Sequence, residues 1–106
     1  MSDSSNARLL LELEKLTRDV NREVMHEAMP QLSLDSLKPI VTVVAQARLS
    51  YLRELVAVAA EDDTPPSYER IQQLAHYRER YEELVAGVQA LERAIEHDYL
   101  DVIDHP

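Results

Sequence analysis

The segment that decides the fold is Ile40-Val41-Thr42-Val43-Val44, because it is the one place where the chain could form a β-strand rather than a helix. All five residues are β-branched, and β-branched residues favour strands. No other segment offers a similar run, however, and a lone strand would leave its backbone N–H and C=O groups unpaired. We therefore predict that residues 40–44 are helical. We also predict that Val43, Val44 and Leu55 are largely buried.

The residues on both sides of this segment extend the predicted helix to about residues 36–60. Pro39 then falls in the first turn, where the N–H that proline lacks has no partner within the helix. Apolar side chains cover most of the circumference of this helix, which is more than two neighbouring helices can cover. A homodimer is the simplest explanation, because one surface then serves both subunits. The predicted interface residues are Ile40, Val43, Val44, Ala47, Tyr51, Tyr77 and Tyr81.

A second amphipathic helix is predicted over about residues 5–29, after a flexible tail of residues 1–5. Its apolar residues recur at steps of three and four, which places them in one stripe. They are Leu9, Leu13, Leu16, Val20, Val24 and Ala28. Pro30 ends this helix. The segment of residues 30–35 has no helical period, and we expect a structured connection in which Leu32 and Leu34 pack against the bundle.

The third predicted helix spans about residues 65–99 and is the longest. It begins after the clearest loop in the sequence, where like charges precede the pair Pro65-Pro66. A chain of 106 residues suits one domain, and a single Gly is too few for the turns of an all-β fold. The sequence therefore predicts an all-α protein, in which residues 1–106 form one antiparallel three-helix bundle with a long third helix.

The composition argues against the common catalytic motifs. Because the chain has no Cys, it has no thiolate nucleophile, disulfide or Cys-ligated zinc. A chain with one Gly has no glycine-rich phosphate loop. Beyond residue 36 the only serines are Ser50 and Ser67, and neither has the Gly neighbours of a nucleophile elbow. We therefore expect neither enzymatic activity nor a cofactor.

The first six residues are polar and acidic, unlike a secretory signal, and we expect a cytoplasmic protein. The longest mainly apolar stretch, residues 49–60, contains Arg53 and Glu54 and is shorter than the roughly 20 residues that a membrane span needs. No membrane association is expected.

The net charge of −9 is concentrated near the C-terminus, where residues 81–106 contain seven acids and one base. Such a field repels phosphate backbones, so direct nucleic-acid binding is disfavoured. A protein partner with a basic surface suits this charge better.

Two groups of residues have the spacing of weak metal sites. Glu23 and His26 match the Glu-x-x-His pattern of carboxylate-bridged di-metal bundles, although a complete site would need a second copy and further Glu residues such as Glu54. Because the pattern occurs once, a water-exposed helix face is the favoured alternative. A second candidate group is His97 and Asp101 with Asp104 or His105. A solvated acidic terminus is the favoured alternative there.

Three functional hypotheses follow. The first is a non-enzymatic, homodimeric interaction module that acts as an adaptor, assembly factor or regulator. The second is an acidic decoy that inhibits a basic nucleic-acid-binding protein, and it rests on the acids of residues 81–106. The third and most distant hypothesis is a homodimeric metal protein that uses Glu23 and His26.

Overall fold

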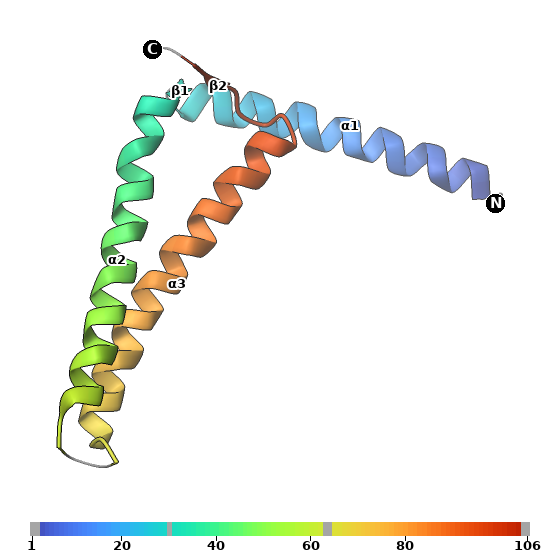
Figure 1. Cartoon of the computed structure of the whole chain (residues 1–106). Helices are drawn as coiled ribbons and strands as arrows, with labels where there is room; N and C mark the ends of the chain where they lie inside the picture. The colour runs from blue at the N-terminus through green and yellow to red at the C-terminus, as the bar shows by residue number, and fades with distance from the viewer. Residues whose placement is uncertain (1–2, 30, 63–64, 105–106) are drawn as a thin grey trace. The chain divides into compact units, whose positions relative to one another are not determined.

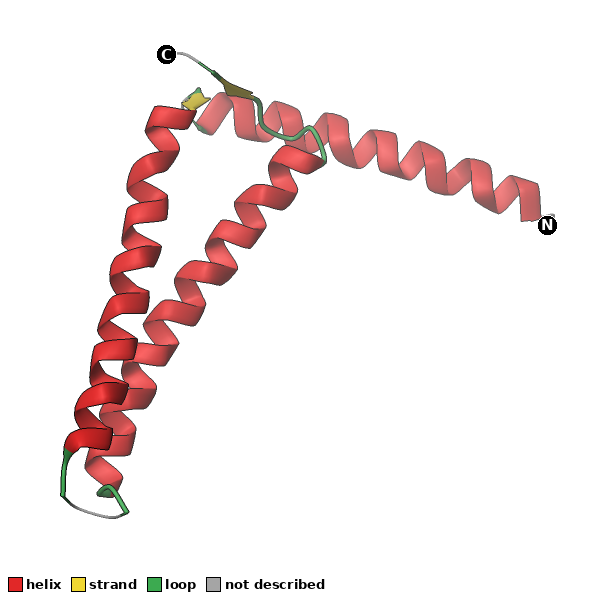
Figure 2. Cartoon of the chain, in the orientation of Figure 1, coloured by secondary structure: helices red, strands yellow, loops and turns green. Residues whose placement is uncertain are grey.

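The computed structural model describes residues 3–29, 31–62 and 65–104 and is built from three helices. These are α1 (Asp3–Ala28), α2 (Leu34–Ala60) and α3 (Tyr68–Glu96), shown in Figures 1 and 2. Two short strands, β1 (Leu32–Ser33) and β2 (Val102–Ile103), are the only other regular elements among the described residues. The all-α fold predicted from the sequence is confirmed.

Residues 40–44 lie within α2 and are helical, as predicted. Pro39 lies in the second turn of this helix, which begins at Leu34 rather than near residue 36. Next to it, the Thr42 hydroxyl donates a hydrogen bond of 2.8 Å to the carbonyl oxygen of Lys38, one turn earlier. The local β-propensity is overridden because a helix satisfies its own backbone groups without a partner strand.

The described contacts divide the chain into two units. The hairpin unit, Ser36–Ala90, contains most of α2 and most of α3. Within it the two helices run antiparallel, lie close together at the loop end and diverge away from it (Figure 1). The terminal unit consists of Met1–Asp35 and Leu91–Pro106. The single domain expected from the sequence stays a prediction.

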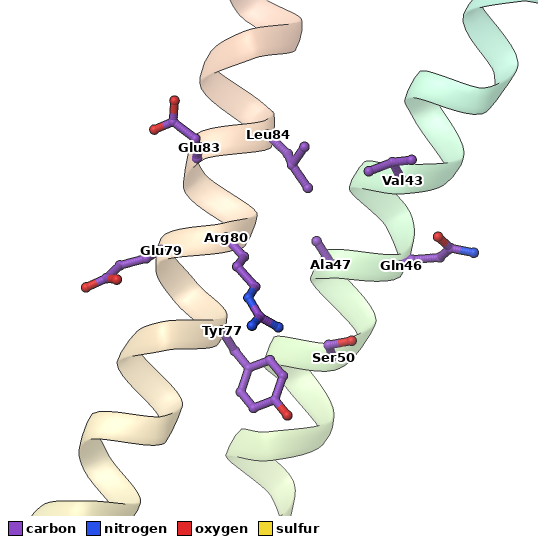
Figure 3. Close-up of a pocket in the computed structure, with 9 residues that line it drawn as sticks. All are labelled: Val43, Gln46, Ala47, Ser50, Tyr77, Glu79, Arg80, Glu83 and Leu84. Carbon is purple, nitrogen blue, oxygen red and sulfur yellow. The ribbon is translucent and has the colours of Figure 1, made fainter.

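The predicted burial of α2 is partly wrong. The side of α2 that faces α3 is a stripe of buried or half-buried residues at steps of three, four or seven, that is, one or two helical turns. Its members are Leu37, Val44, Ala47, Tyr51, Glu54 and Val58. Val43 and Leu55 are 45% and 47% exposed. Leu55 directly follows Glu54 of this stripe, and a step of one residue turns its side chain by about 100° around the helix axis. Val43 is directed toward α3 but stays exposed because the two helices diverge there (Figures 1 and 3). Val44 is half-buried.

Four apolar side chains are buried in the described chain: Leu32, Val58, Ala94 and Leu100. Only Val58 belongs to the hairpin unit. The predicted burial of Leu32 is confirmed, because β1 pairs in parallel with β2 in a register that places Leu32 opposite Val102. The predicted burial of Leu34 is wrong, since this residue is 61% exposed at the start of α2.

α3 ends at Glu96, three residues before the predicted end. Asp98 has a φ of 62°, the left-handed conformation that stops a helix. The Tyr99 N–H donates to the Ala94 carbonyl at 2.8 Å, and the Asp98 N–H donates to the Ile95 carbonyl at 3.1 Å. These two bonds form a Schellman motif with Asp98 at the position that Gly usually occupies.

The helix starts also differ from the prediction. α3 begins at Tyr68 instead of about residue 65, and with 29 residues it exceeds α2 by only two. α1 begins at Asp3, so the expected tail is wrong for residues 3–5, while residues 1–2 lie outside the described chain.

Candidate functional site

The candidate site is a groove of about 690 Å³ between α2 and α3 in the hairpin unit. Figure 3 shows Val43 and Ala47 of α2 directed toward α3, with Tyr77 and Leu84 of α3 directed toward α2. The groove exists because the two helices diverge before these side chains can meet. Its lining residues are Val43, Gln46, Ala47, Ser50, Tyr77, Glu79, Arg80, Glu83 and Leu84.

Charged side chains lie at the rim of this groove. Arg80 points toward α2, and its guanidinium carbon lies 5.9 Å from the centroid of the Tyr77 ring. Glu79 and Glu83 point away from α2 (Figure 3). An apolar floor with a charged rim is the general anatomy of a protein–protein contact surface.

An aromatic contact joins the two helices close to the groove. The rings of Tyr51 and Tyr81 stack with centroids 6.3 Å apart and an interplanar angle of 28°. Arg48 lies over the Tyr81 ring at 5.4 Å and donates from Nε to the Tyr81 hydroxyl at 3.3 Å. Such aromatic pairs and cation–π contacts stabilise by about 0.5–1.5 kcal/mol each. Both tyrosines therefore have a structural role within the hairpin.

An ionic cluster around Arg70 closes the loop end of the hairpin. Its Nη1 lies 2.5 Å from Glu54 Oε1 and donates to Gln73 Oε1 at 3.1 Å, and its Nη2 lies 2.7 Å from Glu61 Oε1. The Arg70 N–H donates to the Ser67 hydroxyl at 3.2 Å, which caps the start of α3. Glu54, which occurs within the apolar stripe of α2, is the ion-pair partner of Arg70 in this cluster.

The terminal unit is fastened by a second ionic contact. Arg22 Nη2 of α1 lies 3.0 Å from Asp101 Oδ2, and the Arg22 guanidinium also donates to the Asp98 carbonyl. The hydrogen bond from Arg22, together with its positive charge, lowers the pKa of Asp101 below its usual value. The hydrogen bond to Asp101 raises the pKa of Arg22. Asp101 is thus held in its charged form.

The candidate metal ligands that the structure describes are not brought together as a group of three. Across residues 3–29, 31–62 and 65–104, no three His, Asp or Glu side chains are placed to hold a metal ion. His26 Nε2 lies 3.8 Å from Asp101 Oδ2, beside the Arg22 contact. The His97 ring stacks on Tyr99 with centroids 5.6 Å apart. His105 lies outside the described residues.

The structure places the seven predicted interface residues in three settings. Val43, Ala47 and Tyr77 line the groove. Val44, Tyr51 and Tyr81 are half-buried, and the two tyrosines stack on each other. Ile40, which is exposed, lies one turn before Val44. Whether a partner covers these residues stays a prediction.

Neither ionic contact is predicted by the sequence patterns. Arg70 lies in the first turn of α3 and Glu54 in the last two turns of α2, so a hairpin with a short loop brings them together. A charged residue inside an apolar stripe, as Glu54 is, was a signal that it has a partner. No comparable signal pairs Arg22 with Asp101, because 79 positions separate them.

No helix in the part of the chain that the structure describes is both long enough and apolar enough to cross a membrane. The fold and the groove define a class: an all-α protein built on a helical hairpin with an open apolar groove. Comparisons with family models, curated proteins and solved structures give no match for this chain.

Proposed function

We propose that this chain is a non-enzymatic helical interaction module that works as a homodimer, in the role of an adaptor, assembly factor or regulator. The observation that carries the proposal is the exposure of α2, the most apolar of the three helices. Val41 and Val56 are 63% and 69% exposed, and Leu49 and Leu52 are about half exposed. Exposed apolar side chains that gather on one helix mark a contact surface.

The groove between α2 and α3 supports the same proposal. It is an open surface rather than an enclosed cavity for a small substrate, and its rim has charges of both signs at Glu79, Arg80 and Glu83. A partner side chain that entered the groove would cover Val43 and Leu84 together. We further propose that the module works in the cytoplasm.

Sedimentation at micromolar concentration tests the homodimer. We expect twice the 12.2 kDa mass of one chain. Leu49→Gln and Val56→Gln should each shift the equilibrium toward the monomer, whereas Leu11→Gln, a matched change at an exposed leucine of α1, should not. A wild-type protein with the mass of one chain would refute the homodimer.

The acidic decoy remains the second candidate, supported by the exposure of Glu82, Glu92 and Glu96 on α3. The dependence of binding on salt concentration distinguishes the decoy from the interaction module. Attraction between an acidic and a basic surface is screened by salt, with a Debye length of about 8 Å at 0.15 M, whereas apolar contacts persist. If binding of a basic nucleic-acid-binding protein falls steeply with salt and again in Glu92→Gln with Glu96→Gln, the decoy is favoured. Binding that changes neither with salt nor with these two substitutions favours the interaction module.

A further inference from the structure

The C-terminal end of α1 has two methionines on one face. Met25 and Met29 are the only methionines of the sequence beyond residue 1. The Met29 N–H donates to the Met25 carbonyl at 2.8 Å, so one helical turn joins the two residues. Residues four apart on a helix have Cβ atoms roughly 5–6 Å apart, with side chains one above the other. Two flexible thioether side chains can therefore reach a common point.

His26 belongs to the same turn and lines the same cavity. This cavity of about 160 Å³ lies within the terminal unit, beside the C-terminal end of α1. Its lining residues are Met25, His26, Met29, Gln31, Leu100 and Asp101. Glu23, which sequence spacing pairs with His26, is not among the described residues that line it. The cavity instead brings together two thioethers and one imidazole.

The exposure of these side chains differs from that of methionines that fill a core. Met25 is half-buried, Met29 is 40% exposed, and His26 is exposed. A methionine that fills a gap in a core is enclosed by apolar neighbours. Here the two sulfur-bearing side chains and the imidazole remain accessible from solvent, so an ion can reach them without unfolding of α1.

The types of ligand select the metal. Thioether sulfur is a soft ligand that favours Cu(I), and imidazole is also a good copper ligand. Mg²⁺ and Ca²⁺ require oxygen ligands, and zinc sites use thiolate, imidazole and carboxylate. The carboxylate of the cavity, Asp101, is paired with Arg22 Nη2 at 3.0 Å. The positive charge of this guanidinium opposes a divalent ion more strongly than a monovalent one.

Asp101 is also placed to orient the imidazole. Its Oδ2 atom lies 3.8 Å from His26 Nε2. A histidine that binds a metal through one ring nitrogen usually donates the other ring N–H to a carboxylate or carbonyl oxygen, which fixes the orientation of the ring. A small movement of the ring brings Nε2 within hydrogen-bond distance of Asp101 and leaves Nδ1 for the ion.

We propose that Met25, His26 and Met29 form a binding site for one Cu(I) ion, with two sulfur ligands and one nitrogen ligand. Asp101 is a positioning residue that orients His26 and does not bind the ion. All three ligands belong to one turn of one chain, so the site does not depend on the homodimer proposed above. The site adds the binding of a soft metal ion to the proposed interaction module.

Titration of the full chain with Cu(I) under anaerobic, reducing conditions tests the site. The ion is supplied as its coloured complex with bicinchoninate, and the colour fades as the protein takes the ion. We expect the uptake of one Cu(I) per chain. Met25→Leu with Met29→Leu should raise the dissociation constant more than about a hundredfold, because losing both sulfur ligands costs more than the roughly 10–100-fold loss of an outer-shell partner.

His26→Gln should also weaken Cu(I) binding, whereas the matched control His76→Gln should leave it unchanged, since His76 is an exposed histidine of the hairpin unit. Circular dichroism checks that each variant keeps its helix content. No uptake of Cu(I) by the wild-type chain would overturn the proposal, and so would equal affinity in the double methionine variant.

NMR of the unaltered chain provides a measurement that does not depend on any variant. Ag(I) replaces Cu(I) as a soft monovalent ion that resists oxidation by air. The methyl signals of Met25 and Met29 and the ring signals of His26 should shift together and stop shifting at one equivalent, while the ring signals of His76 stay in place. A shift of only one methionine, or an equal response of both methionines to Zn²⁺, would overturn the site.

Discussion

The hairpin unit and the terminal unit bury their apolar side chains to different extents. The hairpin unit includes most of α2, the most apolar helix, yet buries only Val58 among the described residues. The terminal unit, which contains the short β1–β2 pairing, buries Leu32, Ala94 and Leu100. Apolar content alone therefore does not determine burial. Segments brought together from both ends of the chain enclose side chains, whereas two diverging helices leave theirs exposed.

The largest effect is expected from truncating Val58, the one buried residue among the described residues of the hairpin unit. Val58→Ala should lower the free energy of unfolding by about 2 kcal/mol, because it removes methyl groups from a packed position. Val56→Ala is the matched control, since Val56 lies two residues before Val58 and is 69% exposed. It should change the free energy of unfolding by less than about 0.5 kcal/mol. Urea denaturation below the dimer dissociation constant measures both. Equal losses would remove the contrast between the two faces of α2.

The second-largest loss of stability is expected from removing the guanidinium of Arg70. Arg70→Met should cost about 1.5 kcal/mol, because Glu54 is partly buried and would lose its ionic partner. The control is Arg78→Met. Arg78 is exposed, and its Nε lies 3.9 Å from Glu82 Oε1. Such a surface ion pair contributes under about 1 kcal/mol to stability. Thermal unfolding followed by circular dichroism compares them. A larger loss for the Arg78 variant would show that the loop end is not held by the cluster.

A smaller effect of opposite sign is expected in the terminal unit. Asp98→Gly should raise the free energy of unfolding by about 0.5–1 kcal/mol, because Gly adopts a φ of 62° without the steric cost of a side chain. The backbone carbonyl that accepts from Arg22 is retained. Asp98→Val should destabilise instead, since a β-branched side chain resists this conformation. If denaturation shows Gly to be no better than Val, the Schellman geometry does not determine stability here.

The smallest effect concerns pH and the contact between Arg22 and Asp101. Because Arg22 lowers the folded-state pKa of Asp101, this contact stabilises the fold above the ordinary carboxyl pKa of 3.8. That stabilisation is lost as the pH falls through the lowered value. An NMR titration of the Asp101 carboxyl carbon measures it, and Arg22→Gln should move the midpoint back toward 3.8. An unchanged midpoint in the variant would show that the contact does not form in solution.

The candidate site was only partly predictable from sequence. Val43 and Ala47 were selected because the apolar excess of α2 exceeded what two neighbours could cover, and both line the groove. Tyr77 of α3, which was predicted as an interface residue from the spacing of the tyrosines, lines it as well. The roles of Tyr51 and Tyr81 depend on their stacking across the hairpin, which helical spacing within one segment cannot reveal. The ion-pair partners of Glu54 and Asp101 could not be predicted for the same reason.

The sequence by itself determined the helical class, the three helices and the helical state of residues 40–44, because periodicity, proline placement and backbone pairing act over a few neighbouring residues. Only the tertiary structure decided that Val43 and Leu55 are exposed, and that Leu32 is enclosed through pairing with β2. It also decided that α3 stops at Glu96, since the left-handed Asp98 lies where the chain returns toward Arg22. These outcomes depend on contacts between residues far apart in sequence, and local patterns do not encode their geometry.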